Sequence, residues 1–447
     1  MPGTKESKWV VLWRKFAMTG LGVLCPEIMT TTAVGQWVRA RQCVQDFNDN
    51  LEEELAKLQE SQQPAGAEKS SIGEKEIWTM QMAYFADMGG FRLRTKNGDE
   101  FPLDAKQIYY LTTKGYIKQP IYRPRLIDDK NKVDVLLRTI ILCQISWFLI
   151  SVIGRWVQRL FVTTAELTTV SFILCSTVTA GFWWHKPADV VMAEIIKIDV
   201  DTDTILNKAG IGPEERDEWR MTPLDFVSRK EWWWSKVWWN FLNILRKMHF
   251  KFGSGGRPTD RLADSCQHPL GRRELYMVIL MSTVCFSVFF TAWKHDFPTW
   301  YELMLWRAAS IALMVMLYML LVIYEILRAL DRVQQRTEQW RQRHFSTHQS
   351  PRSDTQHSRL RNTKYYRRIA EIFTRIDKAL NCVRNNSPDG DKDLSVPLRV
   401  LAPVYVMGFF YCASRAYIMI ADILELRSLP PSAYATVKWE KFWPHLG

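Results

Sequence analysis

The hydrophobic positions of this chain gather into long apolar runs that are separated by charged loops. The clearest run extends from Leu275 to Trp293, 19 residues without a single charge, which is the length of a helix that crosses the hydrocarbon core of a bilayer. Four other runs have a comparable length and predict further spans: 141–154, 167–184, 308–327 and 400–424. The two runs before residue 185 are separated by only a short connector, which predicts an antiparallel pair of helices.

A sixth, weaker run extends from Phe16 to Gly35, with Pro26 and Glu27 at its middle. An acidic residue at the centre of a spanning helix costs about 2.5 to 3.5 kcal/mol, which offsets most of the apolar gain. A basic start and small residues near its end would also allow a cleaved signal peptide, although the central Pro-Glu pair fits that interpretation poorly. We therefore predict a marginal or interrupted first span.

These runs predict an all-α fold, a multi-pass transmembrane helix bundle of about six spans with an interfacial amphipathic helix and cytosolic loop extensions. The predicted organisation is an N-terminus with a marginal first transmembrane helix (1–35), a cytosolic loop with a helix and room for a small hairpin (36–138), a transmembrane hairpin (139–184), a cytosolic loop with an interfacial helix at 232–252 (185–274), a second transmembrane hairpin (275–327), a basic cytosolic helix and linker (328–396), and a last transmembrane helix with a C-terminal tail (397–447).

The distribution of charge predicts which loops face the cytosol. The chain has 59 Lys and Arg against 47 Asp and Glu, a formal net charge of +12. Fifteen basic and eight acidic residues fall in the loop 328–396, whereas the connectors 155–164 and 294–306 carry few basic residues. The positive-inside rule then places the long loops in the cytosol and, with six spans, both termini on the opposite side.

Charged residues inside the apolar runs are the first candidates for a functional site, because they are costly in lipid unless they are paired or hydrated. The candidates are Glu27, Glu166, Arg415 and Asp422. Arg415 and Asp422 are seven residues apart and share one helical face. Glu27 and Arg415 form a hypothetical pair of opposite charges at mid-span depth. Such residues either hold helices together or line a path for an ion or substrate.

The third predicted span ends at Trp183, Trp184, His185 and Lys186, followed by Pro187. Tryptophan rings favour the headgroup layer, a lysine amine extends toward it, and proline stops the helix. We interpret this cluster as the exit of the span. The spatial neighbours of His185 are not specified by the sequence.

The stretch 232–252 predicts a helix that lies in the membrane interface. Trp234 and Trp238 fall on its apolar face, and Lys236, Lys247 and Lys251 fall on the opposite face. This pattern is typical of interfacial helices, which bury an apolar face and are attracted by anionic lipid, so membrane lipid at the cytosolic face is the expected partner. A helix packed on the protein's own cytosolic portion is the alternative.

Parts of the loops predict folded elements of their own. Asn97-Gly98 is a turn signal between two short segments, and the stretch from Asp104 to Gly115 has the capping residue and the terminal glycine of a helix. "IIKIDVDTDT", with Asp199 and Asp201, has the carboxylate spacing of a phosphatase strand end, but a solvated acidic turn is favoured.

Motifs for metal or cofactor binding are not apparent. The eight cysteines have no CxxC spacing, which favours buried reduced thiols over zinc or disulfides. No metal site and no cofactor are predicted. The basic, tyrosine-containing stretch 357–380 would suggest nucleic acid in a soluble protein, but beside spanning helices it favours lipid, and no nucleic acid partner is expected.

Several stretches together resemble a known family: "VLCPEIMTTTAVGQWVRAR", "MGGF", "TTAELTTV", "FWWHKPADV" and "SRAYIMIADILELRSLPPSAYATVKWEKFWPHLG". They are similar to an uncharacterised family of multi-pass integral membrane proteins from filamentous fungi, which has no assigned biochemical function. The resemblance implies a fungal integral membrane protein and supplies no catalytic residues. Family members often have extra N-terminal hydrophobic segments and usually have Ser where this chain has Asn131.

Three functional classes follow from these observations. The sequence does not specify which membrane contains the protein. A channel- or transporter-like protein predicts a water-filled cavity that reaches Glu27, Glu166 or Arg415. A non-enzymatic sensor or scaffold, whose cytosolic loops bind partners or anionic lipid, predicts that packing seals these side chains. A lipid-modifying enzyme at the cytosolic interface needs grouped His or carboxylate residues, for which His185 is the nearest candidate. A non-enzymatic role is favoured because no catalytic constellation is apparent.

Overall fold

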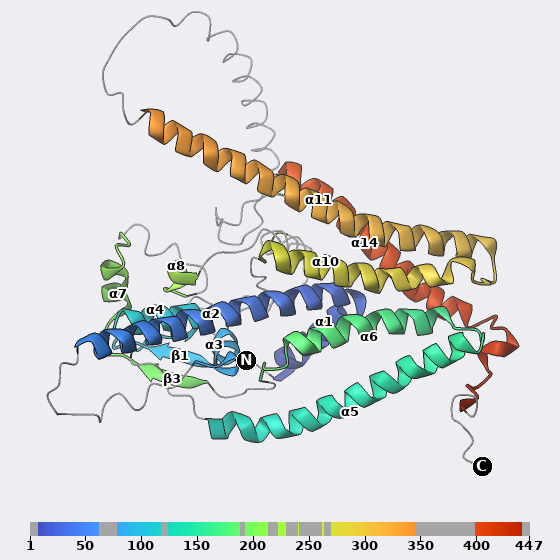
Figure 1. The fold of residues 1–447 in the computed structure, drawn as a ribbon, viewed down its shortest axis with the longest axis horizontal. Coiled ribbons are helices and arrows are strands. Elements are labelled where there is room, and N and C mark those ends of the chain that lie inside the picture. Colours follow the sequence, from blue (N-terminus) through green and yellow to red (C-terminus); the bar gives the residue numbers. More distant parts are fainter. Residues whose placement is uncertain are drawn as a thin grey trace, which may run out of the picture. The chain divides into compact units, whose positions relative to one another are not determined.

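The fold is mostly helical in the computed structural model, which describes residues 8–61, 78–117, 124–187, 193–212, 222–228, 240, 262, 270–345 and 398–439 (Figure 1). Within these described residues, five helical stretches are long and apolar enough to cross a membrane: Thr139–Val157, Thr164–Phe182, Arg272–Lys294, Trp300–Ile326 and Ala402–Glu425. They coincide with the five strong apolar runs of the sequence. The chain divides into two compact units, one of residues 1–235, 253–278 and 429–447, and the other of residues 236–252 and 279–428.

The first unit is organised around two helices, α2 (Pro26–Ser61) and α6 (Thr164–Phe182), which lie alongside each other. The Thr30 hydroxyl lies 3.0 Å from the Thr179 hydroxyl and 3.4 Å from the Cys175 carbonyl oxygen. Gln36, further along α2, contacts Trp183 just beyond the end of α6. Because both pairings advance in the same direction, the two helices run parallel.

The interrupted first span of the sequence is formed by two helices rather than one. α1 (Lys8–Leu24) and α2 are separated by Cys25 and bent by 109° with respect to each other. The break falls where the sequence has Pro26, whose missing N–H and fixed φ are tolerated in the first turn of a helix and disrupt a helix interior.

A small α+β domain forms at one end of α2, around a three-stranded sheet. Its elements in chain order are α3 (Met80–Asp87), β1 (Phe91–Arg94), β2 (Glu100–Leu103), α4 (Ala105–Thr113), β3 (Glu194–Lys197), α7 (Thr202–Lys208) and α8 (Asp225–Ser228). β1 lies in the centre of the sheet, antiparallel to β2 and parallel to β3. The turn between β1 and β2 contains Asn97-Gly98, and Gly98 has a φ of +88°, which glycine adopts without strain.

This sheet corrects the expectation of a purely α-helical chain. The apolar start of "IIKIDVDTDT" forms part of strand β3, Asp199 follows in an exposed bend as expected of a solvated acidic turn, and Asp201 precedes α7 as its N-cap residue. The hairpin predicted around Asn97 is formed by β1 and β2. The helix predicted after Asp104 is α4, which ends at Thr113, two residues before the predicted terminal glycine, Gly115.

The core of the domain includes one face of α2. Ala40, Cys43 and Phe47 of α2 are buried in a single hydrophobic cluster with residues of α3, the sheet and α4. The Phe47 ring stacks on Trp78 with centroids 4.1 Å apart. Full burial of a side chain such as Phe contributes about 1.5 to 3 kcal/mol, so α2 is an integral part of the domain.

At the opposite end of α6, the C-terminal tail contacts the connector that follows α5 (Pro124–Val157). Arg155 donates hydrogen bonds to the carbonyl oxygens of Ala433 and Ala435, and the Gln158 side chain exchanges two hydrogen bonds with the Lys438 backbone. The tail includes a short 3-10 helix, η3 (Pro431–Ala433). The α+β domain and the tail therefore lie at opposite ends of α6.

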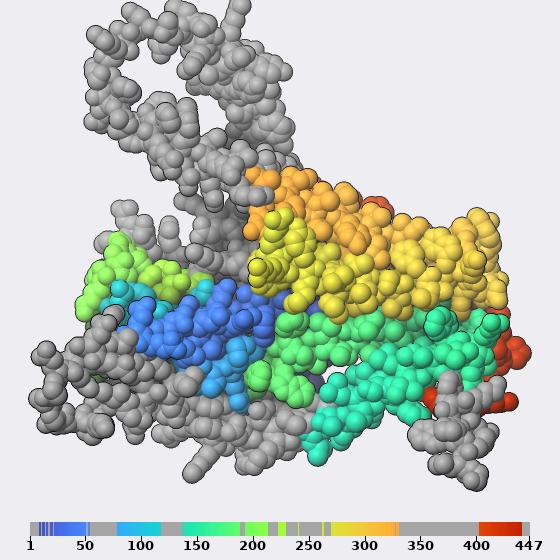
Figure 2. Space-filling model, viewed as in Figure 1, coloured from blue at the N-terminus to red at the C-terminus, as the bar shows by residue number. Residues whose placement is uncertain are grey.

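α5 has a long uncovered surface, which is visible in the space-filling view (Figure 2). Its exposed apolar side chains are Leu136, Leu137, Ile140, Ile141, Trp147, Ile150, Ile153, Trp156 and Val157. An apolar stripe of this length is unusual on a water-exposed surface and is expected of a helix that faces lipid.

The second unit contains the latter half of α10 (Arg272–Ser287), the 3-10 helix η1 (Val288–Lys294), α11 (Trp300–Phe345) and α14 (Leu398–Glu425). α11 and α14 pack extensively against each other. The Trp306 indole is fully buried and donates a hydrogen bond of 3.1 Å to the Phe289 carbonyl, which joins α11 to η1.

Candidate functional site

Two of the predicted in-span charges have local structural partners in the first unit. Glu27 lies in the first turn of α2 with only 8% of its surface exposed, where the helix dipole stabilises a negative charge. Glu166 forms a capping box at the start of α6: Thr163 N–H donates to the Glu166 carboxylate at 2.8 Å, and Glu166 N–H donates to the Thr163 hydroxyl. The Arg155 guanidinium lies 3.5 Å from the Glu166 carboxylate.

The other two predicted charges lie on α14 in the second unit. Arg415 is 2% exposed, and its guanidinium carbon lies 5.3 Å and 5.5 Å from the ring centroids of Phe286 and Phe289. Such contacts stabilise a desolvated cation. Asp422 is partly buried on the same helix. The hypothetical pair of Glu27 with Arg415 would join two different units and stays a prediction.

The exit of α6 is a contact point between three helices, which we call the exit cluster and define as Gln36, Tyr84, Trp183 and Lys186. The Gln36 side-chain oxygen accepts hydrogen bonds of 3.0 Å from both the Trp183 indole N–H and the Lys186 amine. The Lys186 amine also lies 4.2 Å from the centroid of the Trp183 ring. The Tyr84 hydroxyl of α3 donates a hydrogen bond of 2.7 Å to the Phe182 carbonyl.

Burial affects the protonation of this cluster. It lowers the pKa of Lys186 to about 8, and the nearby Asp87 carboxylate acts in the opposite direction. Burial also raises the pKa of the Tyr84 hydroxyl above its ordinary value, so this group remains a hydrogen-bond donor at neutral pH. The polar groups therefore fasten the end of α6 to both α2 and the α+β domain.

The remaining predicted interface residues are not part of the exit cluster. Trp184 and His185 are exposed beside it. No metal-binding group of three His, Cys, Asp or Glu residues occurs in the described parts of the chain. The residues of the predicted interfacial helix lie outside the described residues: Trp234, Lys236, Trp238, Lys247 and Lys251.

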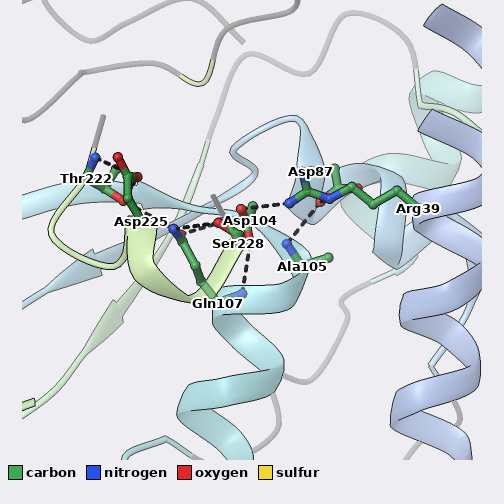
Figure 3. A network of polar contacts seen from close by, with 8 residues as sticks. All are labelled: Arg39, Asp87, Asp104, Ala105, Gln107, Thr222, Asp225 and Ser228. Atoms are coloured by element: carbon green, nitrogen blue, oxygen red, sulfur yellow. Dashed lines mark hydrogen bonds and ion pairs between the residues drawn. The ribbon is translucent and has the colours of Figure 1, made fainter. Parts of the chain in front are cut away.

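A second polar cluster, which the sequence did not predict, lies inside the α+β domain (Figure 3). Arg39 of α2 extends between two carboxylates, with its Nε 3.2 Å from Asp87 and one terminal nitrogen 2.7 Å from Asp104. All three side chains are nearly buried. Asp87 also accepts a hydrogen bond of 3.1 Å from the Ala105 N–H. We call Arg39, Asp87, Asp104 and Gln107 the Arg39 network.

Gln107 extends this network to a segment more than one hundred residues later. Asp104 and Gln107 form a capping box at the start of α4. The Gln107 side-chain amide donates hydrogen bonds to the Thr222 hydroxyl at 3.2 Å and the Ser228 hydroxyl at 3.3 Å. Asp225 in turn accepts a hydrogen bond from the Thr222 N–H. The network thus joins α2, α3, α4 and α8.

The electrostatics of the Arg39 network are those of a buried structural ion pair. Burial raises the pKa of Asp87, while the Arg39 guanidinium lowers it and the Asp104 carboxylate raises it. Asp104 lies at the N-cap of α4, where the helix N-terminus favours a carboxylate. The carboxylates are held by Arg39, by the Ala105 N–H and by the capping box of α4, so the geometry of the cluster supports cohesion of the domain.

Comparison with known proteins identifies one similarity. Residues 5–209 match a family of unknown function (DUF8562). The match covers α1, α2, the sheet and α6, but less than half of the 447 residues. Neither the curated proteins nor the solved structures include a match to this chain.

Proposed function

We propose that this chain is a non-enzymatic integral membrane protein that acts as a sensor or scaffold, with its α+β domain held at the cytosolic face. The proposal rests on the contacts of α2 with both the candidate span α6 and the α+β domain. Its first turns lie against the candidate span α6 through Thr30, and its later turns are buried in the domain core through Phe47. One continuous helix thus belongs to both parts, which is expected of a protein in which membrane and cytosolic portions respond to each other.

The charged residues inside the candidate spans support this proposal over a channel. Glu27 and Arg415 are almost fully buried by packing. Glu166 has a capping role, which the Arg155 side chain reinforces. A conducting path would instead require such groups to line a hydrated cavity.

The partners in this proposal are cytosolic ligands of the domain and anionic lipid. Trp183, Trp184, His185 and Lys186 would lie at the level of the headgroups, where aromatic and basic side chains are favoured. The predicted interfacial helix at 232–252 would contact the same leaflet. On the basis of the sequence resemblance, we also propose that the protein is of fungal origin.

Hydrogen exchange on the full chain in lipid vesicles tests the mechanical part of the proposal. Tyr84→Phe removes only the hydroxyl that bonds to the Phe182 carbonyl, and exchange should increase both in α3 and at the end of α6. Tyr110→Phe is the matched control, because Tyr110 lies in the same domain and its ring contacts Phe226. An increase confined to α3 in Tyr84→Phe would contradict coupling of the domain to the span.

Ion and proton flux across the same vesicles tests the competing function. The proposal predicts flux equal to that of protein-free vesicles, unchanged by Glu27→Gln. A protein-dependent flux that Glu27→Gln abolishes would overturn the scaffold function in favour of a channel.

A further inference from the structure

The bend between α1 and α2 exceeds a right angle, and it therefore determines where α1 can go. A bend of 109° at Cys25 means that α1 does not continue the axis of α2 beyond the junction. The start of α1 instead lies on the same side of the junction as the rest of α2. Figure 1 shows α1 folded back beneath the start of α2.

The position of this bend along α6 can be read from the contacts of Thr30. Thr30 lies beside Cys175 and Thr179, and Pro26 is one helical turn before it, about 6 Å along the axis. The bend is therefore level with about the middle of the 19-residue helix α6. From Pro26 to Gln36 at the exit cluster, α2 advances about 15 Å, which is half of a hydrocarbon core of about 30 Å.

We propose that α1 and α2 form a re-entrant pair that occupies only the leaflet on the side of the α+β domain. This inference rests on the membrane placement in the proposed function. To cross the bilayer, the chain before Pro26 would have to continue away from the domain for about another 15 Å. Its helix turns back instead, so its first residue, Lys8, lies on the domain side. The chain then has five spans, and its two ends lie on opposite sides of the membrane.

The surface of α1 fits this leaflet as its partner. Trp9 is 79% exposed, Trp13 is 60% exposed and Phe16 is 68% exposed, and the same helix contains Lys8, Arg14 and Lys15. Large aromatic side chains together with basic residues are characteristic of helices that bind the boundary between acyl chains and anionic headgroups. An aqueous location would leave these rings in water at a considerable hydrophobic cost.

The start of α2 also has the features that a helix end inside a membrane needs. Thr30, Thr31 and Thr32 each donate their hydroxyl proton to the carbonyl oxygen four residues earlier, at 3.1, 2.8 and 2.8 Å. Their hydroxyl groups are therefore satisfied without water, as the hydrocarbon region requires. Buried Glu27 in the first turn stabilises the positive end of the helix dipole. Its location at a mid-membrane helix start explains an acidic residue at this depth.

Epitope tags on the full chain test this topology in sealed cells or vesicles. One tag precedes residue 1, one is inserted in the β1–β2 turn after Gly98, and one follows Gly447. We expect the first two tags to be accessible from the same side and the third only from the other side. If the first and third tags share a side, opposite the turn tag, α1 crosses the membrane and the re-entrant pair is wrong. If all three share a side, the arrangement of the proposed function fails as well.

Fluorescence quenching tests the contact between α1 and the leaflet independently of the tags. A fluorophore on Phe16→Cys, in a chain whose native cysteines are replaced by serine or alanine, should be quenched by nitroxide-labelled lipid in the leaflet that faces the domain. The same fluorophore on Trp300→Cys, at the start of α11, reports the opposite leaflet in the proposed topology. Quenching of both positions by the same leaflet, or no quenching of the Phe16→Cys probe by either leaflet, would overturn the proposal.

Discussion

The Arg39 guanidinium lies 2.7 Å from the Asp104 carboxylate and thereby joins a helix that accompanies a candidate span to the N-cap of α4 in the domain. The two residues are 65 positions apart in the sequence. Because α2 also supplies core residues to the domain, this ion pair fixes the rotation of α2 relative to α4 as well as their separation.

Replacement of Arg39 by Met should destabilise the α+β domain strongly. The substitution leaves the Asp87 and Asp104 carboxylates buried without their cation, and loss of one partner from a buried ion pair typically costs about 3 to 5 kcal/mol. Hydrogen exchange in α3 and α4 measures the effect on the full chain. Arg41→Met is the control, because Arg41 is exposed and contacts only the face of Trp37 among the interactions described. Equal effects of the two substitutions would contradict a structural role of the Arg39 network.

The amine of Lys186 should titrate well below an ordinary lysine. Burial lowers its pKa from 10.5 to about 8, so the rate of acylation by an amine-reactive reagent should rise with a midpoint near that pH. The folded state binds fewer protons than the unfolded state between these two values, and its stability therefore increases with pH across that window. Peptide mapping of acylation against pH provides the measurement. A midpoint near 10.5 would contradict the desolvation of the exit cluster, and Trp184→Phe, outside the cluster, should leave the midpoint unchanged.

The sequence predicted those features that depend on neighbouring residues. The run Leu275–Trp293 and the candidate span Arg272–Lys294 nearly coincide, because a spanning helix requires only a local excess of apolar residues. The position of Asp104 before a helical stretch likewise predicts its role as a cap. Its position near an apolar run predicts an in-span charge for Glu166, whereas Thr163 three residues earlier completes the sequence pattern of the capping box that the structure contains.

The missed features join residues that are distant in the chain. β3 has only four residues, three of them exposed, and pairs with a strand about one hundred residues earlier. Its alternation is too short to separate a strand from a turn. The Arg39 network connects α2 with α3, α4 and α8, and a single sequence contains no signal for such pairings. Arg39 itself lies in a basic "RAR" stretch that follows an apolar run, as basic residues commonly do where a spanning helix leaves the membrane. The sequence therefore does not distinguish it as a buried residue.

Arg155→Lys should release the C-terminal tail while it preserves the positive charge. The Arg155 guanidinium donates to the carbonyl oxygens of Phe161 and Ala433 at 2.7 Å and of Ala435 at 3.1 Å, and a lysine amine cannot reproduce this planar arrangement. We expect trypsin to cleave after Lys438 several-fold faster. Arg159→Lys, at an exposed position in the same connector, is the matched control. Unchanged cleavage in Arg155→Lys would show that the other contacts of the tail, which include those of Gln158 and the Trp147–Trp439 ring contact, suffice to hold it.

Glu425 and His295 form a nearly buried polar pair in the second unit. The Glu425 carboxylate is 1% exposed and lies 2.7 Å from Nε2 of His295, which fastens the end of α14 to the connector before α11. Glu425→Ala leaves the imidazole nitrogen without this partner, and an unmade buried hydrogen bond costs about 1 to 3 kcal/mol. Glu425→Gln retains the shape and one hydrogen bond, so its loss should be smaller.

Glu302 and Arg427 provide the comparison for this pair, since they form an ion pair at the same end of α14 and the Arg427 side chain is 52% exposed. Exposed ion pairs contribute about 0 to 1 kcal/mol because solvent screens them. Glu302→Gln should therefore change the free energy of unfolding less than Glu425→Ala does. Denaturant unfolding in detergent micelles, followed by a fluorophore on the connector, would rank the three variants. A larger effect of Glu302→Gln than of Glu425→Ala would mean that burial does not determine which pair holds this end of the helix.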